Sequence, residues 1–257
     1  MKIIQSILTK NDCYLAGRKH TVKGLMLHSV GCPQPSAEVS IRQWNQPGIK
    51  KCVHGFIDGN TGNVHQCLPW NYRGWHSGTG SLGSAKNANN TGYIGVEMCE
   101  PSTIKYTGGA SFNDLDSVKT KEVILRTYNS AVELFAFLCK EYKLDPLKDI
   151  VSHAEGHKRG IASNHGDPEH LWKKFGLTMD KFRSDVKAKM GEDDMTKEDV
   201  IKIIEEYEAA KAKKAVSDWA KPSWDKAKSK GIMDGTAPKS HTTREQIATI
   251  LDRLGLL

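Results

Sequence analysis

Two histidines close short apolar runs and are of a residue type that binds metal ions. His28 stands in GLMLHSV, residues 24–30, and His153 ends DIVSH, residues 149–153. Side chains at a strand end, where the backbone turns away, are often functional. A catalytic zinc site uses three protein ligands drawn from His, Asp, Glu and Cys, and these can come from distant parts of a chain. His28 and His153 are therefore candidates for two of the three positions.

Spacing alone leaves the third ligand open. Asp167 lies in NHGDP, where the following proline stiffens the loop after His153. His157 in HAEGH competes for this place, because His153 and His157 would share one face of a helix. Gly156 and Gly160 disfavour a regular helix in that segment. The same segment is also compatible with a histidine-rich surface loop that binds no metal.

A glutamate lies in another short apolar run. Glu97 lies in YIGVEMC, residues 93–99, where large apolar residues alternate with small or polar ones. Such alternation is typical of a strand with one buried face. On this pattern alone, Glu97 is a solvated acid on that strand. Glu100 carries no comparable pattern, and we expect it to be structural.

Short apolar runs bounded by Gly, Asn, Asp or Pro predict the strands that must position these residues. DGNTGNV contains Gly and Asn residues that tolerate positive φ, which predicts a hairpin over 53–68. Apolar residues spaced four and three apart predict a helix over 118–142, and SIRQWN predicts a short helix over 40–45. The order of elements predicts an α/β fold with a mixed central β-sheet flanked by helices. The predicted strands are 24–30, 53–58, 63–68, 93–99 and 149–153.

The apolar pattern stops in AKMGEDDMTKEDV, residues 188–200, which predicts a domain boundary. We expect a catalytic domain over 1–190 and a linker helix with a small all-α domain over 191–257. The linker helix carries an apolar stripe with heptad-like spacing, compatible with an ordinary amphipathic helix or a short coiled coil. The stripe consists of Val200, Ile203, Tyr207 and Ala210.

The end of the chain predicts a helix, a turn and a second helix. Pro222 can begin the first helix, and GIMDGTAP punctuates the chain after it. Thr242 and Glu245 have the spacing of a capping box, which would open the second helix. An apolar face supplies the packing surface of that helix. It consists of Ile247, Ile250, Leu251 and Leu254.

Composition narrows the class of protein without choosing a partner. The formal net charge of +7 favours an anionic partner, either nucleic acid, a membrane surface or an acidic wall polymer. The basic residues are dispersed and form no nucleic-acid motif, and no run of 18 apolar residues could span a membrane. Six scattered cysteines without a C-x-x-C pair predict free thiols. The apolar run in the opening MKIIQSILTKND is too short for a secretory signal. We therefore expect synthesis and storage in the cytoplasm.

Four successive segments resemble the motifs of type-2 N-acetylmuramoyl-L-alanine amidases, zinc enzymes that include many phage endolysins and are related in fold to peptidoglycan recognition proteins. The resemblance spans roughly residues 1–186, and it implies that His28, His153 and Asp167 bind Zn²⁺, since the family has Cys or Asp at the third position. The sequence departs from the family at His165, where a lysine is frequent, and in a longer loop before Asp167. The segments are KGLMLHSVG, VHGFIDGNTGNVHQCLPWNYRGWHSGTG, NNTGYIGVEMCE and VSHAEGHKRGIASNHGDPEHLW.

The resemblance also implies roles for residues around the metal. Glu97 matches the family's catalytic glutamate, which would move a proton from water to the departing amine. His165 would stabilise the oxyanion of the tetrahedral intermediate. His54 and His76 are expected to contact substrate, and Trp75 could line a sugar or peptide groove or pack in the core or rim. The implied substrate is the amide between N-acetylmuramic acid and the L-alanine of the stem peptide.

The C-terminal segment WDKAKSKGIMDGTAPKSHTTREQIATILDRL resembles one S-layer-homology-like wall-binding module. Such modules commonly act in sets of three. The resemblance implies peptidoglycan and anionic wall polymers as partners, with no nucleic acid and no membrane. Homo-oligomerisation through the C-terminal region would gather several copies, and a small stabilising appendage is the alternative.

The expected function is that of an endolysin that lyses Gram-positive cell walls and waits in the host cytoplasm until a holin opens the membrane. Two alternatives belong to other classes. One is a non-catalytic peptidoglycan recognition protein, which has no need of Glu97. The other is a Cys-His hydrolase that uses Cys32 or Cys99, which would respond to thiol alkylation and ignore chelators.

Overall fold

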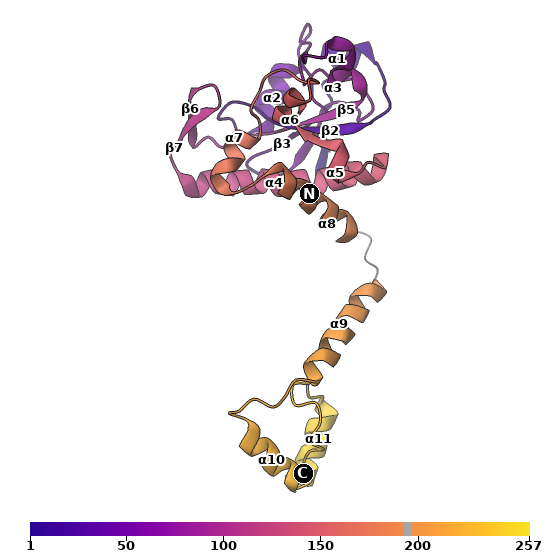
Figure 1. Ribbon diagram of the computed structural model, residues 1–257, viewed down its shortest axis with the longest axis vertical. Helices are drawn as coiled ribbons and strands as arrows, with labels where there is room; N and C mark the ends of the chain where they lie inside the picture. The colour runs from indigo at the N-terminus through magenta and orange to yellow at the C-terminus, as the bar shows by residue number, and fades with distance from the viewer. Residues whose placement is uncertain (193–196) are drawn as a thin grey trace. The chain divides into compact units, whose positions relative to one another are not determined.

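The computed structural model describes residues 1–192 and 197–257, which fall into two compact units (Figure 1). The units are Met1–Asp193 and Asp194–Leu257. The predicted boundary between residues 190 and 191 falls inside helix α8, Met179–Glu192, which belongs to the first unit.

A six-stranded mixed sheet forms the centre of the first unit, as predicted. Its strands lie in the order β1-β4-β3-β5-β2-β8, and every neighbouring pair is parallel except β3 and β4. The chain order of these strands matches four predicted runs and the apolar piece before His153, and β1 is an addition. The strands are β1 Ile3–Gln5, β2 Gly24–Ser29, β3 Gly55–Ile57, β4 Val64–Gln66, β5 Tyr93–Met98 and β8 Ile150–Ser152.

The predicted hairpin is the antiparallel pair β3 and β4. Its turn is held by Asp58, whose carboxylate accepts hydrogen bonds from the backbone N–H groups of Asn60 and Thr61 at 3.0 and 2.9 Å. The unpredicted β1 pairs in parallel with β4. It is three residues long, and a segment of that length is too short to show alternation.

One long helix covers a face of the sheet. Helix α4, Ser117–Tyr142, closely matches the predicted range of 118–142, and Figure 1 shows it running along one side of the strands. It shares a core with Leu25 and Leu27 of β2 and with Ile94 and Val96 of β5. Burying one large apolar side chain in this way stabilises the fold by roughly 1.5–3 kcal/mol. The predicted stripe faces this core: Ile124, Tyr128, Ala131, Phe135 and Leu138 are buried, and Tyr142 packs at its edge.

The opposite face of the sheet carries the polar residues of interest. Successive side chains of a strand point to opposite faces, so Leu25 and Leu27 in the α4 core place His28 on the other side. Val96 in the same core likewise places Glu97 there. His28 and Glu97 are partners in the β2–β5 register. The fold therefore sets a histidine and a glutamate side by side at the ends of two parallel strands.

The remaining elements of the first unit are short. All six cysteines lie in the described residues and are free thiols, as expected. No helix in the described part of the chain is long and apolar enough to cross a membrane. The helices are α1 Asp12–Ala16, α2 Ala37–Trp44, η1 Ser84–Lys86, α3 Ala88–Thr91, α5 Pro146–Asp149, α6 His153–Lys158, α7 Glu169–Trp172 and η2 Lys173–Phe175, and the strands β6 Ile104–Gly108 and β7 Ser111–Asp114 form a separate pair.

The second unit is helical, as predicted. It contains α9 Lys197–Ala212, α10 Lys221–Ser229 and α11 Arg244–Arg253. The capping box of α11 is formed by Thr243 and Gln246, and the predicted pair Thr242 and Glu245 is wrong by one residue. Both pairs have the same spacing, so the sequence pattern could not separate them. Helix α9 exposes five large apolar side chains: Val200, Ile201, Ile203, Ile204 and Tyr207.

Candidate metal centre and active site

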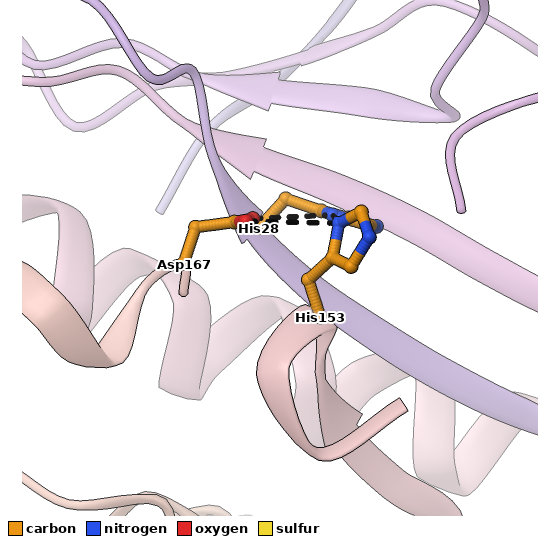
Figure 2. Close-up of side chains that lie close together, drawn as sticks. All are labelled: His28, His153 and Asp167. Atoms are coloured by element: carbon orange, nitrogen blue, oxygen red, sulfur yellow. Dashed lines mark hydrogen bonds and ion pairs between the residues drawn. The ribbon is translucent and has the colours of Figure 1, made fainter. Parts of the chain in front are cut away.

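Three side chains from distant segments converge at the ends of β2 and β8 (Figure 2). His28 lies near the end of β2, His153 begins α6, and Asp167 lies in the loop before α7. One ligand atom from each residue lies within 4.8 Å of the other two. The residues are 1, 2 and 8% exposed, respectively. The fold therefore brings together the three residues that the sequence predicted to converge.

Helix α6 fixes His153, and it contradicts the expectation that glycines prevent a helix here. Ser152 caps the helix, and Ser152 and Glu155 form a capping box. Gly156 assists the packing, because a Cβ there would lie 2.7 Å from Cε of Met26 on β2. His157 is exposed and lies outside the convergent cluster, so the competing HAEGH site does not form.

Asp167 is held as a carboxylate beside the two histidines. Burial alone raises the pKa of Asp167, but the hydrogen bond and charge of His28 outweigh burial and lower it. Its Oδ2 lies 3.4 Å from His28 Nδ1 and accepts a hydrogen bond from the backbone N–H of Ser29 at 3.3 Å. Its Oδ1 lies 3.7 Å from His153 Nδ1. Burial, reinforced by the charge of His28, lowers the pKa of His153 to about 3, so its ring is neutral.

The donor set fits a divalent metal ion. The Nδ1 atoms of His28 and His153 face each other at 2.9 Å, with the Asp167 carboxylate beside both. Two imidazole nitrogens and one carboxylate are the ligand types found in catalytic zinc sites with three protein ligands. Buried charge of this kind is costly unless it is paired or coordinates a metal. His28, His153 and Asp167 could therefore hold such an ion.

Glu97 lies next to this cluster and is prepared to carry a proton. Burial, with the nearby carboxylates of Asp167 and Glu100, raises its pKa to about 8 although His28 opposes the shift. Its Oε2 is buried and has no hydrogen-bond partner among the described residues. A carboxyl group with a pKa near neutrality is suited to act as a general base and then as a general acid.

The sequence comparison decides the family. Residues 18–170 match the family model described as N-acetylmuramoyl-L-alanine amidase. The chain belongs to this amidase family. Its matched region contains all three convergent ligands and Glu97. No curated protein sequence matches the amidase.

Solved structures show the same fold. The catalytic domain of XlyA superposes with a TM-score of 0.51 at 19% identity, covering 72% of the amidase and 99% of XlyA's domain. The hydrolase AmiA of Staphylococcus aureus, solved with its ligand, gives a TM-score of 0.52 at 19% identity, covering 74% of the amidase and 83% of AmiA. PlyL gives a TM-score of 0.50 at 17% identity, covering 72% of the amidase and 97% of PlyL. The mixed sheet flanked by helices is therefore the fold that the catalytic domain of XlyA, AmiA and PlyL share.

His165 is the exposed histidine of the amidase site. Its side chain is 63% exposed, and its Nδ1 lies 4.0 Å from Oδ1 of Asp167. Its ring centroid lies 4.5 Å from that of His153. A substrate entering the site could therefore reach the His165 ring, whereas the ligand histidines are buried.

The structure contradicts the expected substrate contact at His54. The residue is 0% exposed. Its Nε2 donates to the carbonyl of Tyr72 at 2.8 Å, and its Nδ1 accepts from the backbone N–H of Gly95 at 3.0 Å. Burial lowers the pKa of His54 to about 4. Both nitrogens are used inside the fold, so His54 is a structural bridge to β5.

His76 is half-buried, and both of its ring nitrogens have partners inside the fold. Its Nδ1 lies 3.0 Å from Nε2 of His28, and its Nε2 donates to the carbonyl of Tyr93 at 3.1 Å. Burial, and next the charge of His28, lower its pKa well below the ordinary value. The expected substrate contact therefore has no free nitrogen. His76 contacts His28, one of the three candidate ligands, and its expected substrate contact stays a prediction.

Trp75 is half-buried beside the smaller core of the amidase. Its backbone pairs with Cys52 in an isolated bridge, and the Arg73 guanidinium lies 4.9 Å from its ring centroid. A groove role for Trp75 stays a prediction.

The sequence did not predict the contacts that two residues make near the site. Ser163 lies 3.2 Å from His153 Nε2, and nothing in SNHGDP distinguishes a serine with that role. Glu100, expected to be structural, is 1% exposed and accepts hydrogen bonds from Ser29, Gly31 and Tyr106. Burial raises its pKa to about 7. Glu100 therefore secures the chain just after His28.

Proposed function

We propose that this amidase is an endolysin that uses Zn²⁺ to cleave the amide between N-acetylmuramic acid and L-alanine in Gram-positive cell walls. The observation that carries the proposal is the convergence of His28, His153 and Asp167 beside Glu97 within the family-matched region. When bound, the ion would supply Lewis-acid chemistry, making a water molecule more acidic and polarising the scissile carbonyl.

Glu97 is the proposed proton carrier. Its unpartnered Oε2 can accept a proton from the attacking water, because no described side chain competes for that atom. With a pKa raised to about 8 by burial, Glu97 can hold this proton at neutral pH and release it to the amide nitrogen as the bond breaks. The same carboxyl group would serve as base and then as acid.

His165 is proposed to stabilise the charge that develops on the substrate carbonyl oxygen. It is the exposed histidine beside the buried ligands, so its ring can approach that oxygen without leaving its loop. A hydrogen-bond donor directed at a developing oxyanion commonly contributes about 2.7–4 kcal/mol to catalysis. This role replaces that of the lysine frequent in the family.

Two alternatives make different predictions. A peptidoglycan recognition protein would bind the stem peptide without cutting it. A Glu97 whose buried Oε2 has no partner, beside three side chains that could hold a metal, favours the enzyme. A Cys-His hydrolase is disfavoured because burial raises the pKa of Cys99 and Cys32. A nucleophilic thiol needs a lowered pKa.

The C-terminal unit is proposed to bind a wall polymer. Between α10 and α11 it encloses a pocket with a volume of about 560 Å³, within the usual range of roughly 300–1,000 Å³ for ligand sites. Trp224, Asp234, His241 and Arg253 are among its lining residues. An aromatic ring with charged and polar groups suits a saccharide that bears charge. This proposal also rests on the S-layer-homology-like pattern of the sequence.

Helix α9 is proposed to join copies of the chain, so that single wall-binding modules act together. Its apolar stripe is exposed, and a second α9 is the occupant that its heptad-like spacing fits. Glu206 and Lys211 take the flanking positions that lie opposite each other in a parallel pair, where their charges attract. The charges that flank the stripe on one α9 helix therefore complement those on a second copy.

A cell-wall assay separates the enzyme from the binder. Purified Gram-positive walls are incubated with the protein, with and without a chelator, and turbidity is followed. We expect the wall suspension to clear, the chelator to abolish this clearing, and added Zn²⁺ to restore it. Sedimentation of the protein with walls that never clear would support the recognition protein instead.

A further inference from the structure

His76 joins His28 to a backbone carbonyl of β5, and the direction of the hydrogen bonds is fixed from one end. A carbonyl oxygen only accepts, so the bond of 3.1 Å to Tyr93 requires a proton on His76 Nε2. The neutral His76 ring then presents a bare Nδ1, which accepts from His28 Nε2 at 3.0 Å. His28 therefore carries a proton on Nε2, and its Nδ1 is turned towards the metal cluster.

A second chain of hydrogen bonds does the same for His153. The hydroxyl of Ser163 donates to the carbonyl of Ser77 at 3.2 Å, which uses its single proton. Its oxygen then accepts from His153 Nε2 at 3.2 Å. His153 also keeps its proton on Nε2 and turns the Nδ1 lone pair towards Asp167.

The two hydrogen-bond chains turn both Nδ1 atoms towards the same point. With each Nε2 donating away from the cluster, the two Nδ1 atoms face each other across 2.9 Å beside a carboxylate. We propose that His76 and Ser163 are positioning residues that fix the tautomers of His28 and His153, so that both Nδ1 atoms are committed to the metal before it binds. The inference rests on the proposed metal site and adds the residues that prepare it.

The backbone of β5 is built to admit the His76 ring. A Cβ at Gly95 would lie 2.3 Å from His76 Cγ, so any larger residue would push the ring away. Glycine inside a strand weakens the strand and often marks a close approach by another group. The backbone N–H of His76 donates to Asn89 Oδ1 at 2.7 Å, which holds the other side of the ring's segment. Gly95 and Asn89 thus determine where His76 lies.

The test uses the full chain and compares two substitutions of His76. His76→Phe keeps a ring but removes the acceptor that faces His28, whereas His76→Asn keeps an oxygen close to the position of Nδ1. Zinc affinity is measured by competition with a chromophoric chelator. His76→Phe should bind Zn²⁺ about 10–100-fold more weakly, the usual effect of losing an outer-shell partner, and His76→Asn should recover most of that loss.

Long-range ¹H–¹⁵N spectra of the metal-free protein report which ring nitrogen carries the proton, and they do not depend on amidase activity. The unsubstituted protein should show the Nε2–H form at His28 and His153 on the alkaline side of their titration. His76→Phe should mix the tautomers at His28 alone, and Ser163→Ala should mix them at His153 alone. Because two variants act on two different histidines, misfolding of one leaves the other as a test.

His20→Phe is the matched control, since His20 is a histidine whose ring nitrogens have no hydrogen-bond partner among the described residues. It should leave both tautomers and the zinc affinity unchanged. A His28 proton on Nδ1 in the unsubstituted protein would overturn the inference. So would a His76→Phe variant with unchanged tautomer and unchanged zinc affinity. Loss of wall cleavage with these results intact would instead contradict the proposed function alone.

Discussion

His28 and Glu97 are register partners on the parallel strands β2 and β5, and both lie on the face of the sheet opposite α4. One residue carries a candidate metal-binding nitrogen and the other a buried carboxyl oxygen without a partner. Because they occupy adjacent strands, their relative position is set by backbone hydrogen bonds and not by flexible loops. The fold thus holds the proposed proton carrier beside the candidate metal site.

Glu97→Gln should separate binding from turnover. The amide cannot exchange a proton, so we expect cleavage to fall by about 10²–10⁴-fold while zinc binding is kept. Zinc content and the release of N-terminal alanine measure the two effects. Glu100→Gln is the matched control, because an amide there still accepts from Ser29 and Gly31. Near-normal turnover in Glu97→Gln would remove Glu97 from the mechanism.

Asp167→Asn should weaken metal binding without removing the side chain's contact to the backbone of Ser29, which an amide oxygen can still accept. Loss of the negative charge should lower zinc affinity by at least about 10-fold, and activity should then require added zinc. His157→Ala, at an exposed position outside the cluster, is the comparison. Equal zinc affinity in the two variants would contradict the assignment of Asp167 as a ligand.

Gly95→Ala should displace His76. The added Cβ would meet the His76 ring at 2.3 Å, and overpacking of this kind costs about 1–3 kcal/mol of stability. Zinc affinity should fall together with stability in urea unfolding. Gly191→Ala provides the control, because a Cβ there has nothing within 4 Å. A Gly95→Ala protein with unchanged zinc affinity would show that the ring's position does not matter.

His54 should make the protein sensitive to acid. Burial lowers its folded-state pKa to about 4 from an ordinary value of 6.5, so the unfolded chain binds the proton more tightly. The stability from neutral His54 is present above pH 6.5 and is lost as the pH falls towards 4, by up to about 3 kcal/mol. Urea unfolding of the protein and of His54→Gln at several pH values should show a shallower loss in the variant. Parallel pH curves would refute this role.

Self-association through α9 should be visible by light scattering. The unsubstituted chain is expected to exceed the monomer mass at micromolar concentration. Ile203→Glu with Tyr207→Glu places charge in the apolar stripe and should give monomers that still cleave soluble muropeptides. Lys213→Glu, outside the stripe, is the comparison. A monomeric unsubstituted chain at all accessible concentrations would reject the proposal.

Long periodic elements were predictable from the sequence, because helical spacing over 118–142 and alternation in the strands express burial directly. The hairpin followed from Asp, Gly and Asn in its turn. The pairing of β1 with β4 could not be predicted, because three residues carry no periodicity. Helix α6 was missed since Ser152 and Glu155 stabilise it through a capping box although Gly156 lies within it.

The metal-binding set was predicted from strand ends and from resemblance, and the fold brings His28, His153 and Asp167 together. The structural role of His54 was not predicted, because a motif position does not show which atoms already have partners. The ring nitrogens of His54 bond to a backbone carbonyl and a backbone N–H, and those of His76 bond to a backbone carbonyl and the ring of His28. Only three-dimensional hydrogen bonding distinguishes a substrate contact from a residue that prepares the site.

The most direct test of the central claim is the identity of the bond that is cut. Purified Gram-positive walls are digested with the zinc-loaded protein, and new N-terminal alanine and new reducing sugar are assayed separately. The account predicts alanine ends without reducing ends, abolished by chelation and restored by zinc. Reducing ends, or no new ends of either kind, would contradict it.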